Sequence, residues 1–167
     1  MEKKDLKPAG VFKYFEEICQ VPRPSKKEEK MIAYLKAFGA KHNLETKVDE
    51  AGNVLIKKPA TPGKENLQTV VLQSHIDMVC EKNNDVQHDF LTDPIETEID
   101  GEWLKAKGTT LGADNGIGVA TELAILADDS IEHGPLECLF TVDEETGLTG
   151  AFALQEGFMN GDIRLNL

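Results

Sequence analysis

The hydrophobic and polar positions of this chain follow two different periods. Apolar residues at spacings of three and four predict amphipathic helices, at 11–19, 31–38 and 116–127, with a shorter one at 149–154. Alternating or strongly apolar runs predict strands, at 46–48, 53–57, 69–73, 103–106, 136–142 and 163–167. Because strands alternate with helices, the pattern indicates an α/β fold with a largely parallel sheet.

The connections between these elements carry further signals. A turn-forming cluster at 49–52 separates the first two predicted strands, which favours an antiparallel hairpin. Ser25 followed by Glu28 has the form of a capping box, so we expect the second helix to begin there. The polar, acidic stretch 83–101 is expected to be a connection.

The charge balance narrows the classes of partner. Of the 167 residues, 18 are Lys or Arg and 30 are Asp or Glu, a formal net charge of −12. Nucleic acids and anionic membranes are bound by clustered Lys and Arg, so we expect neither as a partner, whereas cations are expected. The three cysteines are widely spaced, and the chain shows no signal peptide or membrane-spanning run, so we expect reduced thiols and a cytoplasmic protein.

His75 and Asp77 follow a predicted buried strand and form the first of three polar clusters. At a spacing of two on an extended backbone, both side chains project to the same side. The imidazole could then bind a metal while the carboxylate holds its tautomer. The alternative interpretation is a polar strand end with no metal.

The second cluster spans residues 112–118 and precedes a predicted helix. Its glycine spacing matches neither a dinucleotide-binding turn nor a phosphate loop. Small residues around Asp114 let the backbone approach a ligand closely, and its two carboxylate oxygens can bridge two cations. The alternative is an Asp or Asn that caps the helix.

The third cluster is the acidic run Asp143, Glu144 and Glu145, at the end of the most apolar predicted strand. Adjacent carboxylates disfavour one another's ionisation unless cations neutralise them. Neighbouring side chains point in different directions, so one carboxylate can bind a metal while the next handles a proton. The alternative is a solvated acidic turn.

Taken together, the three clusters predict a hydrolytic metal centre. One imidazole and several carboxylates at strand ends suit zinc, which accepts nitrogen and oxygen ligands, although Mn²⁺ and Co²⁺ accept them too. A bridging Asp114 suits two metals about 3.5–4 Å apart that clamp a hydrolytic water and a carbonyl group.

Longer stretches closely resemble the bacterial aminoacyl-histidine dipeptidases, at residues 72–83, 88–90, 100–118, 133–137 and 144–151. This family, also called the cytosol non-specific dipeptidases, belongs to the co-catalytic di-zinc peptidases. The resemblance implies a three-layer helix/sheet/helix catalytic domain of the zinc-exopeptidase type, with a mostly parallel mixed central sheet. It also implies that residues 1–167 are the N-terminal portion of that domain.

The resemblance also implies roles for individual residues. His75 would bind one zinc ion, Glu145 the other, and Asp114 both; the peptide bond after Asp114 is expected to be cis. Asp77 would orient the imidazole, and Glu144 would be the general base that activates water. The implied reaction is the hydrolysis of small peptides with a free amino terminus, typically Xaa-His dipeptides.

Members of the family are longer than this chain. They carry a lid-like domain through which they would form homodimers, a metal-binding Asp directly after a strand resembling 162–167, and a further His ligand near the far C-terminus. We therefore expect this chain to hold part of the ligand set and to be inactive alone. Two further hypotheses are a related di-metal aminopeptidase or deacylase, and a non-catalytic chain that binds a complementary chain.

Overall fold

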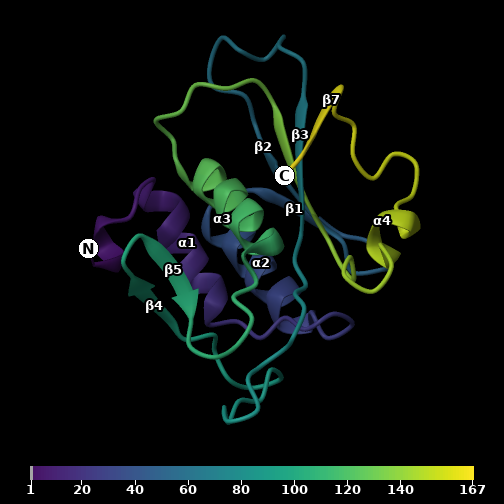
Figure 1. Cartoon of the computed structure of the whole chain (residues 1–167). Coiled ribbons are helices and arrows are strands. Elements are labelled where there is room, and N and C mark those ends of the chain that lie inside the picture. The colour runs from purple at the N-terminus through teal and green to yellow at the C-terminus, as the bar shows by residue number, and fades with distance from the viewer. Residues whose placement is uncertain (1) are drawn as a thin grey trace.

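The protein, described here over residues 2–167 by a computed structural model, consists of a five-stranded sheet, a separate two-stranded hairpin and flanking helices (Figure 1). The helices are the 3₁₀ turn η1 (Lys3–Asp5), α1 (Ala9–Cys19), α2 (Glu29–Lys41), α3 (Ala113–Ala127) and α4 (Thr149–Ala153). The strands are β1 (Glu45–Val48), β2 (Val54–Lys58), β3 (Val70–His75), β4 (Thr97–Asp100), β5 (Trp103–Ala106), β6 (Leu136–Thr141) and β7 (Ile163–Asn166). None of these helices is long and apolar enough to cross a membrane.

The main sheet places its two central strands where a site can form. Its order is β1-β2-β6-β3-β7. Strand β3 runs parallel to both β6 and β7, whereas β2 runs antiparallel to both β1 and β6. His75, the last residue of β3, pairs with Thr141, the last residue of β6. The segments that follow the two strands therefore leave the same edge of the sheet side by side, which is where open α/β sheets carry their sites.

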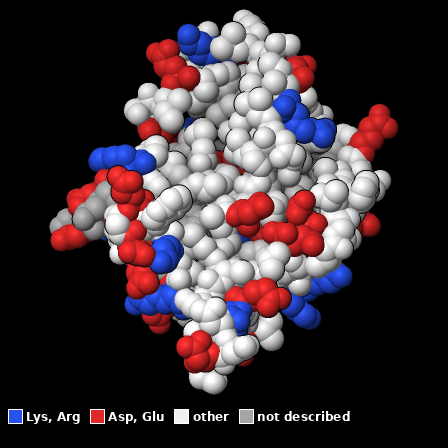
Figure 2. Space-filling model, in the orientation of Figure 1, with Lys and Arg blue, Asp and Glu red and all other residues white. Residues whose placement is uncertain are grey.

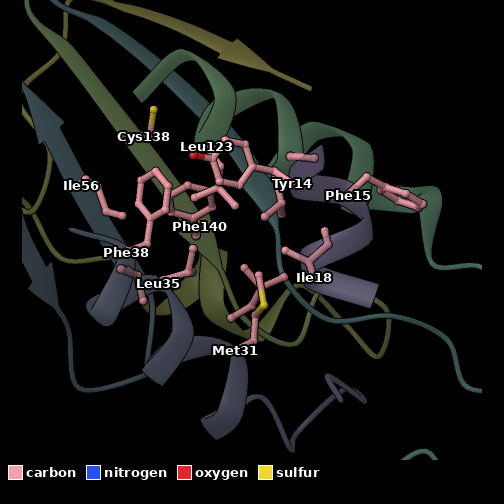
Figure 3. Packing of buried hydrophobic residues seen from close by; sticks show 14 of the residues in the cluster. Tyr14, Phe15, Ile18, Met31, Leu35, Phe38, Ile56, Leu123, Cys138 and Phe140 are labelled. Atoms are coloured by element: carbon pink, nitrogen blue, oxygen red, sulfur yellow. The ribbon is translucent and has the colours of Figure 1, made fainter. Parts of the chain in front are cut away.

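Helices α1, α2 and α3 cover one face of the sheet (Figure 1). One buried cluster contains Phe15 and Ile18 of α1, Leu123 of α3 and Phe140 of β6, and all four side chains are almost completely buried (Figure 3). Burial of such a side chain stabilises the fold by about 1.5–3 kcal/mol. This face therefore supplies most of the hydrophobic stabilisation.

A smaller apolar cluster covers the opposite face. Leu55, Val71 and Leu139 point away from the three long helices, and Leu154, Phe158 and Met159 of the segment after α4 pack over them. The sheet is thus mixed, with two parallel and two antiparallel strand pairs, and it is covered on both sides, which confirms the predicted α/β fold class.

Two local predictions were wrong. The stretch 83–101 contains β4, which pairs with β5; its Glu98 and Asp100 are poor strand formers, so local propensity hid a strand that pairing stabilises. The predicted capping box is absent. The Ser25 hydroxyl donates a hydrogen bond to Asp77, and Glu28 accepts amide hydrogen bonds from Lys26 and Asp143, so α2 begins at Glu29 without a side-chain cap.

Glu122 of α3 is a carboxylic acid inside the hydrophobic core. Its side chain is completely buried, neither oxygen has a hydrogen-bond partner of good geometry, and the side chains of Ser74 and Cys138 face it. Burial raises the pKa of Glu122 to about 8. The folded chain therefore holds this carboxyl group mostly neutral at pH 7.

Glu122→Gln should remove a pH dependence of stability. The folded carboxyl keeps its proton to about pH 8, whereas in the unfolded chain it ionises above its ordinary pKa of 4.5. Ionisation thus favours the unfolded state, and the wild-type free energy of unfolding should fall between about pH 5 and pH 8 by at most about 1.4 kcal/mol per pH unit from this group. Urea unfolding at several pH values measures this slope. The exposed control Glu29→Gln should keep it, and a Glu122→Gln slope equal to that of the wild type would contradict the prediction.

Candidate metal centre

The fold brings the five predicted site residues to one place. His75 ends β3 and Asp77 follows it, Asp114 lies at the start of α3, and Glu144 and Glu145 lie in the loop after β6. Nε2 of His75 is 3.0 Å from Oδ1 of Asp114 and 3.8 Å from Oε2 of Glu144. Figure 2 shows acidic side chains gathered on this face, over the start of α3 and the loop after β6.

One group of ligand atoms among these residues converges closely enough to bind a cation. A ring nitrogen of His75 and carboxylate oxygens of Asp114 and Glu145 all lie within 4.8 Å of one another. An imidazole and two carboxylates are a donor set that suits Zn²⁺ and similar divalent cations. The residues present therefore fit the metal that the sequence predicted.

The start of α3 is shaped so that Asp114 can project into the site. Gly112 has a positive φ of 67°, and a Cβ atom there would lie 2.5 Å from Nη2 of Arg23, so only glycine fits. The Asp114–Asn115 peptide bond is cis, as the resemblance implied, and both residues have non-helical backbone angles. The residue at the cap position is Gly112, and no side chain caps the helix.

Asp77 is completely buried beneath the site and holds three segments together. Its carboxylate accepts hydrogen bonds from the Ser25 hydroxyl at 2.7 Å and from the backbone amides of Glu144 and Glu145 at 3.0 and 3.1 Å. Oδ1 also lies 3.2 Å from Nδ1 of His75. Burial opposes ionisation of Asp77, but these hydrogen bonds outweigh it and lower the pKa to about 2.

The charges at the site are unbalanced without a cation. Burial raises the pKa of Glu145, and the carboxylates of Asp114, Glu144 and Asp77 add to this, while His75 opposes it. Burial lowers the pKa of His75, but hydrogen bonds to Asp77 and Asp114 raise it by more. Neighbouring carboxylates contribute to both shifts, and a divalent cation would neutralise their negative charge.

A second group of carboxylates lies deeper, and its members accept hydrogen bonds from other parts of the protein. Glu28, Asp77 and Asp143 are all buried with carboxylate oxygens within 4.8 Å of one another. Glu28 accepts two backbone amides, and Asp143 accepts the Thr146 hydroxyl at 2.6 Å. These contacts tie loops together, so we interpret this group as a support for the site above it.

Arg23 fixes the backbone on two sides of the site. Its guanidinium is buried and donates hydrogen bonds to the carbonyl oxygens of Ile76 and Asp77, both at 3.2 Å, and of Gly112 at 2.6 Å. These carbonyls flank the strand end that carries His75 and the turn that carries Asp114. Arg23 could not be recognised as functional from the sequence, because a single Arg between two prolines has no periodicity or motif.

Cavities open on both sides of Asp114. One of about 250 Å³ is lined by residues that include Gln73, Thr141 and Leu148, together with His75 and Glu144. A second, of about 410 Å³, is lined by Asp114, Glu145 and the segment 110–113. A small molecule could therefore reach the candidate ligands from solvent. A cavity of about 480 Å³ between α1 and the end of α3 contains none of the candidate ligands.

Comparison with known proteins decides the family. The sequence profile of peptidase family M20/M25/M40 matches residues 71–166, more than half of the chain. The chain belongs to this peptidase family. Membership implies divalent metal ions, and the matched segment contains the candidate residues His75, Asp77, Asp114, Glu144 and Glu145.

Individual M20 relatives are similar over nearly the whole chain. The cytosol non-specific dipeptidase of Escherichia coli K12 is 51% identical over 165 residues, which are 99% of this chain and 34% of that protein. The crystal structure of aminoacylhistidine dipeptidase from Vibrio alginolyticus matches with a TM-score of 0.96 and 55% identity, over 99% of this chain and 34% of that one. Aminopeptidase PepT from Bacillus cereus matches with a TM-score of 0.80 and 26% identity, over 95% of this chain and 42% of that one.

These matches confirm the resemblance seen in the sequence. The mixed sheet with its helices matches the catalytic domain of M20 peptidases. The chain spans about a third of the length of the two dipeptidases that it matches.

Arg23→Lys should destabilise this M20 chain by about 1–3 kcal/mol, because an ammonium group cannot span carbonyl oxygens on two loops as a planar guanidinium does. Urea unfolding measures the difference. The matched control is Arg164→Lys on the exposed strand β7, which should change stability by no more than about 0.5 kcal/mol. Equal losses in the two variants would show that the buried contacts of Arg23 contribute nothing specific.

Proposed function

We propose that this chain is the N-terminal portion of the catalytic domain of a di-zinc dipeptidase that hydrolyses Xaa-His dipeptides. The observation that carries the proposal is the convergence of His75, Asp114 and Glu145 within 4.8 Å, with Glu144 beside them. The names of the two dipeptidases that resemble the chain over 99% of its length support the substrate class.

We assign metal binding and proton transfer to different side chains of the site. His75 and Glu145 would each hold one zinc ion and Asp114 would hold both, with Mn²⁺ or Co²⁺ as possible substitutes. When bound, the metal pair polarises the peptide carbonyl group and lowers the pKa of water. Asp77 lies 3.2 Å from Nδ1 of His75 and so leaves Nε2 facing Asp114 as the ligand atom.

We assign Glu144 to proton transfer rather than to metal binding. Its side chain is half-buried, lines the 250 Å³ cavity and comes within 3.8 Å of His75. It would take the proton of the attacking water and deliver it to the amine that leaves when the peptide bond breaks. The backbone amide of Glu144 is fixed by Asp77, which holds the base in register with the ligands.

The ligand set proposed here is partial. We propose that the remaining metal ligands, the substrate-clamping lid and the homodimer contacts lie outside these 167 residues, because the chain spans about a third of its dipeptidase relatives. The chain alone would then bind metal without completing the reaction.

A related di-metal aminopeptidase is the second candidate function. It is favoured by the TM-score of 0.80 to aminopeptidase PepT at 26% identity. A substrate panel on a protein that contains this chain and the complete site separates the two. Release of the amino-terminal residue from tripeptides as fast as from Xaa-His dipeptides would favour the aminopeptidase.

Glu145→Gln should weaken Zn²⁺ binding by this chain about 10-fold or more, because an amide oxygen is a poorer ligand than a carboxylate. Its neighbour, Glu144→Gln, should bind Zn²⁺ about as tightly as the wild type, because a base that does not ligate contributes little to affinity. Isothermal titration with Zn²⁺ measures both. A larger loss in Glu144→Gln than in Glu145→Gln would reverse the assigned roles.

The isolated chain with added Zn²⁺ should release no histidine from an Xaa-His dipeptide above background. Turnover comparable to that of a full-length relative would contradict the proposal that ligands are missing. Activity that returns only when a polypeptide covering the remaining two thirds of a relative is added would support it, and would also establish that this chain binds a complementary chain.

A further inference from the structure

Four consecutive backbone amides in the loop after β6 are held by side chains from elsewhere in the chain. For residues 142–145, in order, the acceptors are Asn53 Oδ1, Glu28 Oε1, Asp77 Oδ1 and Asp77 Oδ2, at 3.1, 2.9, 3.0 and 3.1 Å. All three acceptor side chains are buried. β6 ends at Thr141, so these amides have left the sheet ladder and need other partners.

Asn53 is fixed in place on its other side. Its Nδ2 donates to Oδ2 of Asp49 at 2.7 Å and to the carbonyl oxygen of Gly150 at 2.8 Å. Asp49 in turn accepts the amides of the turn between β1 and β2. The side chain of Asn53 therefore joins that turn, the loop after β6 and helix α4, with its oxygen oriented toward residue 142.

Glu28 is oriented by the turn that precedes α2. Its Oε1 also accepts the amide of Lys26, which has a positive φ of 66°. The same oxygen then accepts the amide of Asp143, 115 positions further along the chain. Glu28 thus reaches the loop as a preoriented acceptor.

The four contacts set which way the acidic side chains of this loop point. Asp143, which has a positive φ of 49°, is turned inward and buried, whereas Glu144 and Glu145 remain half-buried beside His75 and Asp114. A loop that slipped by one residue would exchange a buried carboxylate for a candidate ligand. Asp77 alone holds only the last two amides, so the entry of the loop depends on Asn53 and Glu28.

We propose that Glu28 and Asn53 are positioning residues of the metal centre, which act through the backbone of residues 142–145 to hold Glu145 in ligating position and Glu144 beside it. The proposal rests on the proposed function for the roles of Glu144 and Glu145. Both residues contact the loop through its backbone amides, and neither belongs to the group formed by His75, Asp114 and Glu145.

The test compares Glu28→Ala, Glu28→Gln and the exposed control Glu29→Ala in the 167-residue chain. Two measurements are made on each: Zn²⁺ affinity by isothermal titration, and hydrogen exchange of the amides of residues 142–145. Glu28→Ala should weaken Zn²⁺ binding about 10- to 100-fold, the range for groups that orient a metal ligand. It should also speed exchange at residue 143. Glu28→Gln keeps an acceptor oxygen, so its Zn²⁺ affinity and its exchange rate at residue 143 should both lie within about threefold of the wild-type values.

Asn53→Ala should likewise speed hydrogen exchange of the amide of residue 142. If this variant does not fold, the comparison of Glu28→Ala with Glu28→Gln tests the proposal. Wild-type affinity and exchange in Glu28→Ala would overturn the proposal. So would a loss that Glu28→Gln does not rescue, because that result assigns the effect to charge or general stability. If the wild-type chain binds no Zn²⁺, the proposed function fails, and exchange at residue 143 alone decides whether Glu28 holds the loop.

Discussion

The candidate site depends on one buried carboxylate, that of Asp77. An ionised group in this position is stable only because hydrogen bonds replace its hydration, and here the donors come from segments far apart in the sequence. The hydroxyl of Ser25 approaches from the connection before α2, and two amides approach from the loop after β6. Asp77 thereby links the ends of the two central parallel strands, and it keeps the His75 imidazole oriented.

Around Asp77, other buried polar groups form hydrogen bonds with one another, which offsets the free-energy cost of burying them. Arg23 supplies donors to backbone carbonyls below the site, while Glu28 and Asn53 supply acceptors to backbone amides. The result is a fixed layer of hydrogen-bonded groups beneath His75, Asp114, Glu144 and Glu145. Local negative charge at these residues, rather than the net charge of −12 over the whole chain, is the feature that favours a cation.

Much of this could be predicted from the sequence, because strong periodicity marks the three long helices and the buried strands. The candidate ligands were also predictable, since His75, Asp114 and Glu145 stand at or next to strand ends or helix starts and fall in recognisable motifs. The residues that support the site could not be predicted in this way. Ser25 and Glu28 satisfy a local capping pattern, yet their partners, Asp77 and Asp143, lie at least 52 positions away in sequence. Local patterns cannot rank a distant partner above a near one, and the same limitation hid β4, whose stability comes from pairing with β5.

The central claim is that the fold of these residues brings His75, Asp114 and Glu145 together on a divalent cation. Crystals of the chain soaked in Zn²⁺, with diffraction measured at the zinc absorption edge, test this claim directly. The account predicts anomalous density about 2.0–2.2 Å from Nε2 of His75 and from carboxylate oxygens of Asp114 and Glu145. Density confined to the buried group of Glu28, Asp77 and Asp143, or to histidines elsewhere on the surface, would contradict it.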